Sequence, residues 1–344
     1  MTHPIVREDI ECIFKIVGND LNRLQGKRLL ITGGTGFIGT WLLETICWLN
    51  KNSNQPCKVY VPTRNPAAFA QKAPHLASSP DIVLLPGDVA DFDYPDDECD
   101  FVIHAAAPAE PKAINQNFLG VAETIVQGTR HVLKLAKQKN IESFLFVSSG
   151  AVYGVQPPDL EKVPEDYFGA PDLTKIRSAY GEAKRYAEML CTLHHQIYGL
   201  PIHIARPFTF VGPYQDLNAG FAITDFIRDG LQGGPLTIHG DGTTVRSYCY
   251  AADMAAMLWK ILLNSPVGRV YNVGSDVSIS ISELANKVIS FLDNPVDVVI
   301  MSKPQPNSKP ARYVPDINRA RLELGVDIYT DIDKAIRRTL SWMK

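Results

Sequence analysis

Residues 27–39, KRLLITGGTGFIG, decide the fold of this chain. The apolar run 28–32 predicts a short buried strand, and three glycines follow it directly: Gly33, Gly36 and Gly39. Gly33 permits a tight turn, Gly36 lets the backbone approach a pyrophosphate, and Gly39 allows the next helix to pack close to the strand. Free backbone N–H groups at the start of that helix would then bind the anion. This position favours a dinucleotide-binding turn over an ordinary tight turn.

Outward from this turn, short apolar strands alternate with helices. The pattern predicts strands over 28–32, 58–63, 81–88, 100–106, 143–149 and 201–207, and helices over 37–49, 66–74, 124–138 and 180–198. Strands and helices that alternate in this way form a parallel sheet covered on both faces. The expected fold class is therefore α/β, a doubly wound Rossmann domain with a smaller α/β substrate lobe.

The length of 344 residues exceeds what one hydrophobic core usually serves, so we expect a main domain and a smaller lobe. Residues 1–26 have apolar side chains at helical spacing, which predicts a helical extension that packs on the domain or on a partner subunit. Residues 27–206 form the predicted dinucleotide-binding domain, to which segments near 245–275 return. Residues 207–344 are mainly the substrate lobe, and the proline-rich stretch 303–310 predicts a mobile surface loop.

The composition is that of an ordinary soluble globular protein, with 45% hydrophobic and 21% charged residues. A formal net charge of -3 and the lack of a basic stripe argue against nucleic acid as a partner. The first residues lack the features of a secretory signal, and no apolar run reaches membrane-spanning length, so we expect a cytoplasmic protein. The six cysteines form no CxxC pair and no Cys/His cluster, so no metal site is expected.

The end of the second predicted strand bears on the choice of cofactor. An NAD-specific Rossmann site usually has an acidic residue there, but this sequence reads Thr63-Arg64-Asn65. Arg64 favours binding of the 2′-phosphate of NADP(H), and NAD(H) remains the alternative if Arg64 is a solvated surface cation.

Tyr180 and Lys184 predict acid–base chemistry. They are four residues apart, so the phenol and the ammonium emerge from one face of a predicted helix, one turn apart. A tyrosine with a pKa of about 10 is a poor base at neutral pH, but a neighbouring cation stabilises the phenolate and lowers its pKa. Ser149 ends an earlier strand and would hydrogen-bond the reacting oxygen. Each motif alone also occurs as a helix contact or a capping serine, but together they predict proton exchange during hydride transfer.

In combination, these motifs resemble the NAD-dependent epimerase/dehydratase family of nucleotide-sugar enzymes, which are extended short-chain dehydrogenases. The resemblance runs from about residue 27 to the C-terminus, in the family's order: the glycine turn, His104-Ala-Ala, Ser148-Ser-Gly-Ala-Val-Tyr153-Gly, Tyr180-xxx-Lys184, Arg206-Pro-Phe-xxx-Gly212-Pro and Arg246…Asp253. It implies that Ser149, Tyr180 and Lys184 are the catalytic residues. It also implies a nucleoside-diphosphate sugar as substrate, a place in polysaccharide biosynthesis and a homodimer formed by paired long helices.

The resemblance further implies which residues bind ligands. Asp88 lies where the family places an acid beside the adenine, or else forms a turn, and Pro207 begins the loop over the nicotinamide. Arg246 and Arg312 fall at positions of a diphosphate clamp, which suits a guanidinium, and Asn218 is a candidate phosphate or sugar contact; otherwise these three are surface residues. The residues expected to contact the cofactor are Gly33, Thr35, Gly36, Phe37, Ile38, Gly39, Arg64, Asp88, Val89, Ala105, Ala106, Tyr180, Lys184 and Pro207.

Departures from the family pattern narrow the reaction. The 4,6-dehydratases carry Asp-Glu before the Val-Tyr-Gly triplet, and the sugar-acid decarboxylases resemble them in keeping the Glu, whereas Gly150 and Ala151 here cannot move a proton. What remains is net reduction of a 4-keto sugar, or C4 epimerisation through a transient ketone with retained NAD. We favour the 4-ketoreductase because Arg64 favours exchangeable NADPH. The family's usual Asn is here Ile125, which argues against a standard water relay.

Two alternatives come from outside nucleotide-sugar chemistry. A non-catalytic dinucleotide sensor would keep the glycine turn but has no need of Tyr180 and Lys184 at this spacing. A dehydrogenase of a small ketone would share the catalytic residues but has no need of a diphosphate-binding Arg246.

Overall fold

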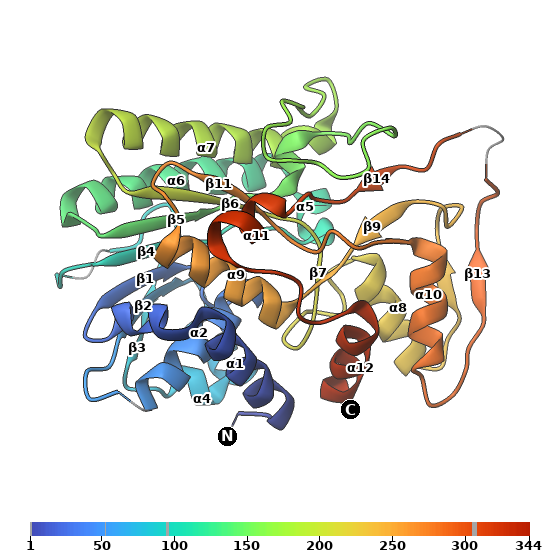
Figure 1. Cartoon of the computed structure of the whole chain (residues 1–344), viewed down its shortest axis with the longest axis horizontal. Helices are drawn as coiled ribbons and strands as arrows, with labels where there is room; N and C mark the ends of the chain where they lie inside the picture. Colours follow the sequence, from blue (N-terminus) through green and yellow to red (C-terminus); the bar gives the residue numbers. More distant parts are fainter. Residues whose placement is uncertain (1, 52, 94–95, 305–307) are drawn as a thin grey trace.

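The computed structural model describes residues 2–51, 53–93, 96–304 and 308–344. Its centre is a parallel sheet in the strand order β11-β6-β5-β4-β1-β2-β3 (Figure 1). The strands are β1 (Arg28–Thr32), β2 (Lys58–Thr63), β3 (Ile82–Pro86), β4 (Phe101–His104), β5 (Ser143–Val147), β6 (Ile202–Pro207) and β11 (Val270–Val273). The order reverses between β1 and β4, which places the ligand crevice beyond the carboxyl ends of these strands. The predicted doubly wound α/β fold is confirmed.

Each strand contributes to a hydrophobic core on either face of the sheet. In β1, the side chains of Leu29 and Ile31 lie in one core and that of Leu30 lies in the other. Successive side chains of a strand point to opposite faces, so a sheet buried on both faces needs strands that are apolar throughout. This requirement explains the continuous apolar runs in the sequence.

Different helices cover the two faces. One core contains buried side chains of α1 (Pro4–Val17), α2 (Phe37–Lys51) and α9 (Ala251–Asn264), and the other contains those of α6 (Phe118–Lys139) and α7 (Ala179–Tyr198) (Figure 1). Shorter helices connect the strands: η1 (Gly18–Leu24), α3 (Pro66–Lys72), α4 (Pro74–Ala77), α5 (Pro111–Gln116), η2 (Gly150–Tyr153) and η3 (Ile176–Ser178). Among the described helices, none combines the length and apolarity needed to cross a membrane.

The later part of the chain forms a smaller lobe beside the carboxyl ends of the strands (Figure 1). It contains α8 (Ala222–Leu231), α10 (Ile281–Ser290) and α12 (Ile332–Met343), whereas α11 (Asn318–Leu324) packs on β11 and α9. β9 (Val245–Ser247) lies between β12 (Ser278–Ser280) and β14 (Arg312–Tyr313). Two further pairs are β8 (Leu236–Ile238) with β13 (Val298–Ile300) and β7 (Phe210–Val211) with β10 (Cys249–Tyr250).

The N-terminal extension packs on its own domain. Arg338 of α12 donates to Glu8 at 3.0 Å and to the carbonyl of Ile5 at 2.8 Å, and it forms an ion pair with Asp9. The Tyr250 hydroxyl donates to Asp9 at 2.6 Å. Burial raises the pKa of Asp9 to about 6, although these partners oppose the rise. The N-terminal extension was predicted to pack on its own domain or on a partner subunit, and in this structure it packs on its own chain.

The elements differ from the predicted ranges in places that local contacts explain. The helix predicted from residue 124 already begins at Phe118, because the Asn117 side chain accepts from the Gly120 N–H and caps it. The stretch 207–249 contains α8, a helix that was not predicted because the stretch is rich in glycine and proline. The predicted domain boundaries stay a prediction, and residues 305–307 of the predicted mobile loop lie outside the described residues.

Candidate active site

The glycine turn lies between β1 and α2, and its glycines have steric reasons to be there. Gly33 has a φ of +71°, which favours glycine. A Cβ on Gly39 would lie 2.3 Å from Gly34 Cα, so only glycine lets α2 pack this close to the turn. At Gly36, a Cβ would meet one described atom within 4 Å, the Gly33 carbonyl oxygen at 3.3 Å. That open side, at the N-terminus of α2, fits a pyrophosphate.

Other predicted cofactor contacts surround this turn. A Cβ on Gly33 would lie 2.8 Å from the backbone of Ala105 and Ala106, which follow β4. Thr35, Phe37 and Ile38 are half-buried at the turn itself. Val89 is buried against Gly128 of α6, and Pro207 ends β6 at the same edge of the sheet.

The residues at the ends of β2 and β3 form an ion pair. Arg64 Nε lies 3.8 Å from Asp88 Oδ2, and the Arg64 side chain is 77% exposed. Asp88 also accepts from the backbone N–H of Ala90 at 3.0 Å, which is the turn role predicted as the alternative to an adenine contact. The structure thus brings the two predicted residues together and leaves most of the Arg64 guanidinium accessible to a phosphate.

Ser149, Tyr180 and Lys184 converge at the carboxyl end of β5. The Ser149 hydroxyl accepts from the Ala151 N–H at 3.1 Å, at the start of η2, and it lies near enough to Tyr180 to influence the pKa of that phenol. One helical turn after Tyr180, Lys184 Nζ donates to the Val147 carbonyl at 2.7 Å. The backbone of β5 therefore holds the serine and, through its last carbonyl, the lysine of the neighbouring helix.

Burial dominates the protonation of this group. It raises the pKa of Tyr180, with the hydrogen bond to Ser149 opposing the rise, and it lowers the pKa of Lys184 to about 8. A bound nicotinamide cation would act in the opposite direction on the tyrosine. Ser148 Oγ is also buried and has no hydrogen-bond partner among the described residues.

His104 is a structural residue beside this group. Its Nδ1 hydrogen-bonds Thr32 Oγ1 at 2.7 Å, and its Nε2 hydrogen-bonds Thr129 Oγ1 at 3.0 Å. Burial, with a smaller effect of Lys184, lowers the pKa of His104 to about 3, so the ring stays neutral. Ile125, where the family has an Asn, is buried, and its carbonyl accepts a hydrogen bond from Thr129 Oγ1 at 2.7 Å.

Two cavities bear on the site, and the catalytic residue Tyr180 lines the larger of these two. One, of about 920 Å³, is lined by Ala151, Tyr180 and Gly181 and by the segment 171–178. The other, of about 530 Å³, lies in the smaller lobe and is lined by Arg246, among others. Tyr313 lines both.

Comparison with known proteins agrees with this geometry. The model of the NAD dependent epimerase/dehydratase family matches residues 29–274. UDP-glucuronic acid decarboxylase 3 of Arabidopsis thaliana is 32% identical over 298 residues, which cover 87% of this chain and 83% of that protein. The chain belongs to this family. It is an enzyme of the extended short-chain dehydrogenase type, which confirms the predicted resemblance.

Solved structures of the family share the fold. UDP-glucuronic acid 4-epimerase from Bacillus cereus in complex with NAD is 25% identical, with a TM-score of 0.76 over 92% of this chain and 96% of that one. A dTDP-glucose 4,6-dehydratase from Streptomyces venezuelae with NAD bound is also 25% identical, with a TM-score of 0.77 over the same shares of the two chains. The family thus includes members with different reactions on one scaffold.

Two predicted substrate contacts line neither of these cavities. Asn218 is exposed on a turn, where its backbone N–H donates to Asp216 at 2.8 Å, and it lines neither cavity. Arg312, which precedes Tyr313 in β14, also lines neither. Arg246 does line a cavity, and its guanidinium lies 5.5 Å from the centroid of the Tyr313 ring.

Sequence reasoning missed two residues of this epimerase/dehydratase site. Lys72 Nζ donates to the Thr35 carbonyl at 3.0 Å, which places a cation at the glycine turn. Tyr313 lies beside Ser149 and comes from a strand 133 positions after Tyr180 in the chain. The position of Lys72, in the last turn of the helix before β3, could have suggested it as a cation near the cofactor. No local sequence pattern identifies Tyr313 as a site residue.

Proposed function

We propose that this enzyme transfers hydride at C4 of a nucleoside-diphosphate sugar, with Ser149, Tyr180 and Lys184 as its catalytic residues. The convergence of these three side chains at the carboxyl end of β5, in the same sheet as the glycine turn, carries the proposal. Relatives and structural neighbours named for UDP-glucuronic acid or dTDP-glucose support a nucleotide sugar as the substrate. The cavity with Arg246 offers a cation for its diphosphate.

The chain's own groups account for the proton chemistry. When bound, the nicotinamide supplies or accepts the hydride. Ser149 Oγ hydrogen-bonds the C4 oxygen and holds it against the phenol. In reduction, Tyr180 Oη gives its proton to that oxygen, and in oxidation the phenolate takes it. Lys184, charged at neutral pH, stabilises the phenolate.

The preferred net reaction is reduction of a 4-keto sugar by NADPH. The exposed Arg64 supports this reaction, because it offers a cation to a 2′-phosphate and its partner Asp88 lies 3.8 Å away, beyond hydrogen-bond distance. Gly150 and Ala151 support a reaction without a further acid or base. The second candidate is C4 epimerisation with retained NAD. The ion pair supports it if Asp88 neutralises the charge of Arg64. The structural similarity to a UDP-glucuronic acid 4-epimerase supports it too.

The cofactor distinguishes the two reactions. Purified protein is denatured and the released nucleotide identified: stoichiometric NAD supports the epimerase, and an empty site that binds NADPH before NADH supports the reductase. Arg64→Ala should then raise the KM for NADPH about tenfold or more and leave that for NADH unchanged. Lys58→Ala, at the other end of β2, is the matched control. Turnover of no nucleotide sugar with either cofactor would refute the proposal.

We also propose a homodimer formed through α7. Tyr186, Met189, Leu193 and Ile197 are 41% to 64% exposed and recur at helical spacing along one side of this helix. Large exposed apolar side chains in one stripe are typical of a protein–protein interface. The long helix α6 packs beside α7 and would form the other half of a four-helix contact.

A further inference from the structure

Ser149 and the Tyr180–Lys184 pair reach the active site from different elements. Ser149 caps the N-terminus of η2, whereas Tyr180 and Lys184 belong to α7. The segment 154–178 that connects the two elements contains the short helix η3 and otherwise turns and irregular chain. The local chain therefore does not determine the distance from the serine to the phenol, and contacts between η2 and α7 have to determine it.

Arg206, the fifth residue of β6, contacts both elements. Its Nε and Nη2 atoms donate to the two carboxylate oxygens of Glu188, one turn after Lys184 on α7, at 2.9 Å and 2.6 Å. Its Nη1 atom donates at 2.9 Å to the hydroxyl of Tyr153, the last residue of η2. The side chains of Arg206 and Glu188 are 15% and 11% exposed, so solvent screens this pair little. One planar guanidinium thus connects the two elements that carry the catalytic residues.

The Tyr153 hydroxyl is held from its other side as well. Burial raises the pKa of Tyr153 to about 12, so the phenol keeps its proton and donates a hydrogen bond to Asn272 Oδ1 at 2.8 Å. Asn272 lies opposite Arg206 in the pairing of β11 with β6. Arg185 of α7 makes a second, weaker connection to η2, to the carbonyl of Val152 at 3.2 Å. The central sheet therefore supports the link between η2 and α7.

The same guanidinium determines the partner of the Lys184 ammonium. Lys184 and Glu188 are four residues apart on α7, the spacing at which a lysine and a glutamate form an ion pair on a helix. Both carboxylate oxygens of Glu188 bind Arg206, and Lys184 Nζ donates to the Val147 carbonyl instead. Removal of Arg206 alone would release Glu188 to bind Lys184, so a test of the link has to remove Glu188 too.

We propose that Arg206 is a positioning residue for the catalytic reaction. Its guanidinium holds Glu188 of α7 and Tyr153 of η2 together. It thereby sets the spacing at which Ser149 and Tyr180 reach the same substrate oxygen. The inference rests on the proposed function, because it takes these two hydroxyls to act on one oxygen. It also gives a role to the Arg206-Pro-Phe motif, which the proposed chemistry does not use.

The test removes the ion pair as a unit. Arg206→Met with Glu188→Leu leaves no unpaired buried charge, and replacement of a buried pair by apolar side chains is often neutral for stability. Circular dichroism and urea unfolding check the fold. Hydride transfer is measured on whichever of UDP-glucose, UDP-glucuronic acid, dTDP-glucose and the 4-keto form of each wild type turns over. We expect kcat to fall about 10- to 100-fold, because a misplacement of about 1 Å has an effect of this size.

A loss of positioning should appear in kcat and not in binding. The KM for the sugar and the Kd for the dinucleotide should stay within about threefold of wild type, because uniform binding is not altered. Arg269→Met with Glu323→Leu is the matched control: it removes another arginine–glutamate pair with two hydrogen bonds, at the amino end of β11. Its kcat should equal that of wild type.

Two milder variants test the connection to η2. Tyr153→Phe removes the hydroxyl that Arg206 binds, and Arg206→Lys keeps a cation for Glu188 but lacks the planar fork that reaches both groups. Each should lower kcat about 3- to 10-fold, the effect of one hydrogen bond. Because both remove the same link, the combined variant should be within about twofold of the less active single variant.

The outcomes separate this inference from the proposed function. Wild-type kcat in folded Arg206→Met/Glu188→Leu overturns the inference while the proposed function stands, and so does a loss that lies in KM or in dinucleotide affinity. If that double variant does not fold, the milder variants decide, and additive losses in Tyr153→Phe and Arg206→Lys overturn the inference. If wild type transfers hydride with none of these sugars, the proposed function fails together with the inference.

Discussion

Lys184 shows how one residue can serve catalysis at a cost in stability. Its side chain is 2% exposed, and the charged form loses hydration that one carbonyl hydrogen bond does not replace. Its pKa is about 8 in the folded protein, below the ordinary value of 10.5. The folded state therefore binds this proton less tightly than the unfolded state, and the penalty is fully present below pH 8.

Lys184→Met should therefore stabilise the protein while inactivating it. At pH 7 we expect the free energy of unfolding to rise by about 2 kcal/mol, after allowance for the lost hydrogen bond to Val147. The advantage should shrink as the pH rises from 8 towards 10.5, where wild type no longer carries the buried charge. Urea unfolding of both proteins at pH 7 and pH 10 measures this difference. If Lys184→Met is no more stable than wild type at pH 7, the buried charge of Lys184 does not destabilise the fold.

Tyr180→Phe removes only the proton donor. We expect kcat to fall by about 10²- to 10⁴-fold, because general acid–base catalysis contributes an effect of this size. Dinucleotide affinity, measured by fluorescence titration, should change little, since the ring and Lys184 remain. Full activity in this variant would assign the proton transfer to another group.

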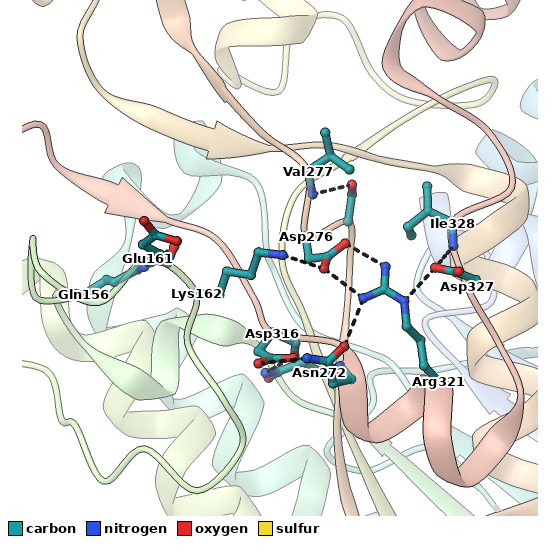
Figure 2. Close-up of polar contacts among 12 residues, drawn as sticks. Gln156, Glu161, Lys162, Asn272, Asp276, Val277, Asp316, Arg321, Asp327 and Ile328 are labelled. Carbon is teal, nitrogen blue, oxygen red and sulfur yellow. Dashed lines mark hydrogen bonds and ion pairs between the residues drawn. The ribbon is translucent and has the colours of Figure 1, made fainter.

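At the scale of elements, one buried carboxylate ties the loop after β11 to α11 and to the segment that contains Lys162. Asp276 accepts from Lys162 at 2.7 Å and from Arg321 at 2.8 Å and 2.9 Å (Figure 2). Burial acts against ionisation, but hydrogen bonds from Arg321 and Lys162 outweigh it and lower the pKa of Asp276 to about 2. Lys162 lies in the segment that also holds the backbone next to Tyr313.

Asp276→Asn should destabilise the fold by about 2 kcal/mol at pH 7, since a carboxylate with a lowered pKa stabilises the folded state above its unfolded pKa. The stabilisation should decline as the pH falls below 3.8 towards 2, so the gap between variant and wild type should narrow at pH 3. Denaturant unfolding at the two pH values tests this expectation. Asp327→Asn, which removes a 57% exposed partner of the same Arg321, should change stability by less than about 1 kcal/mol. Equal effects of the two substitutions would contradict the role of Asp276.

Local patterns made part of this site predictable from the sequence. The glycine turn and the Tyr180–Lys184 pair each lie within one strand-to-helix turn or one helix, where spacing alone determines geometry. The position of Tyr313 depends on the register between β14 and β9, two segments more than sixty residues apart, and no local pattern encodes it. Arg312, predicted by resemblance, lines neither cavity, while its neighbour lines both.

At the scale of the whole molecule, the exposed apolar stripe on α7 is the surface best suited to a second subunit. Met189→Glu with Leu193→Glu should convert the proposed dimer to a monomer, because two buried charges per subunit would be desolvated without partners. Light scattering coupled to gel filtration gives the mass, and circular dichroism checks the fold. Leu322→Glu, an 86% exposed apolar residue on α11, is the control and should leave the mass unchanged. A wild-type monomer, or a double variant with dimeric mass, contradicts the proposed interface.

The first helix has a consequence for any attempt to trim the enzyme to its nucleotide-binding core. Residues 1–26 precede the first recognisable motif and would be the obvious part to remove. Yet Val6, Ile10, Ile13, Val17, Leu21 and Leu24 are at most 2% exposed. At about 1.5–3 kcal/mol for each buried side chain, their joint contribution is of the same order as the whole stability of a typical domain, about 5–15 kcal/mol. A truncation that starts at the glycine turn would thus uncover α9 and yield an insoluble chain, and it would also remove Glu8, the partner of Arg338 on α12.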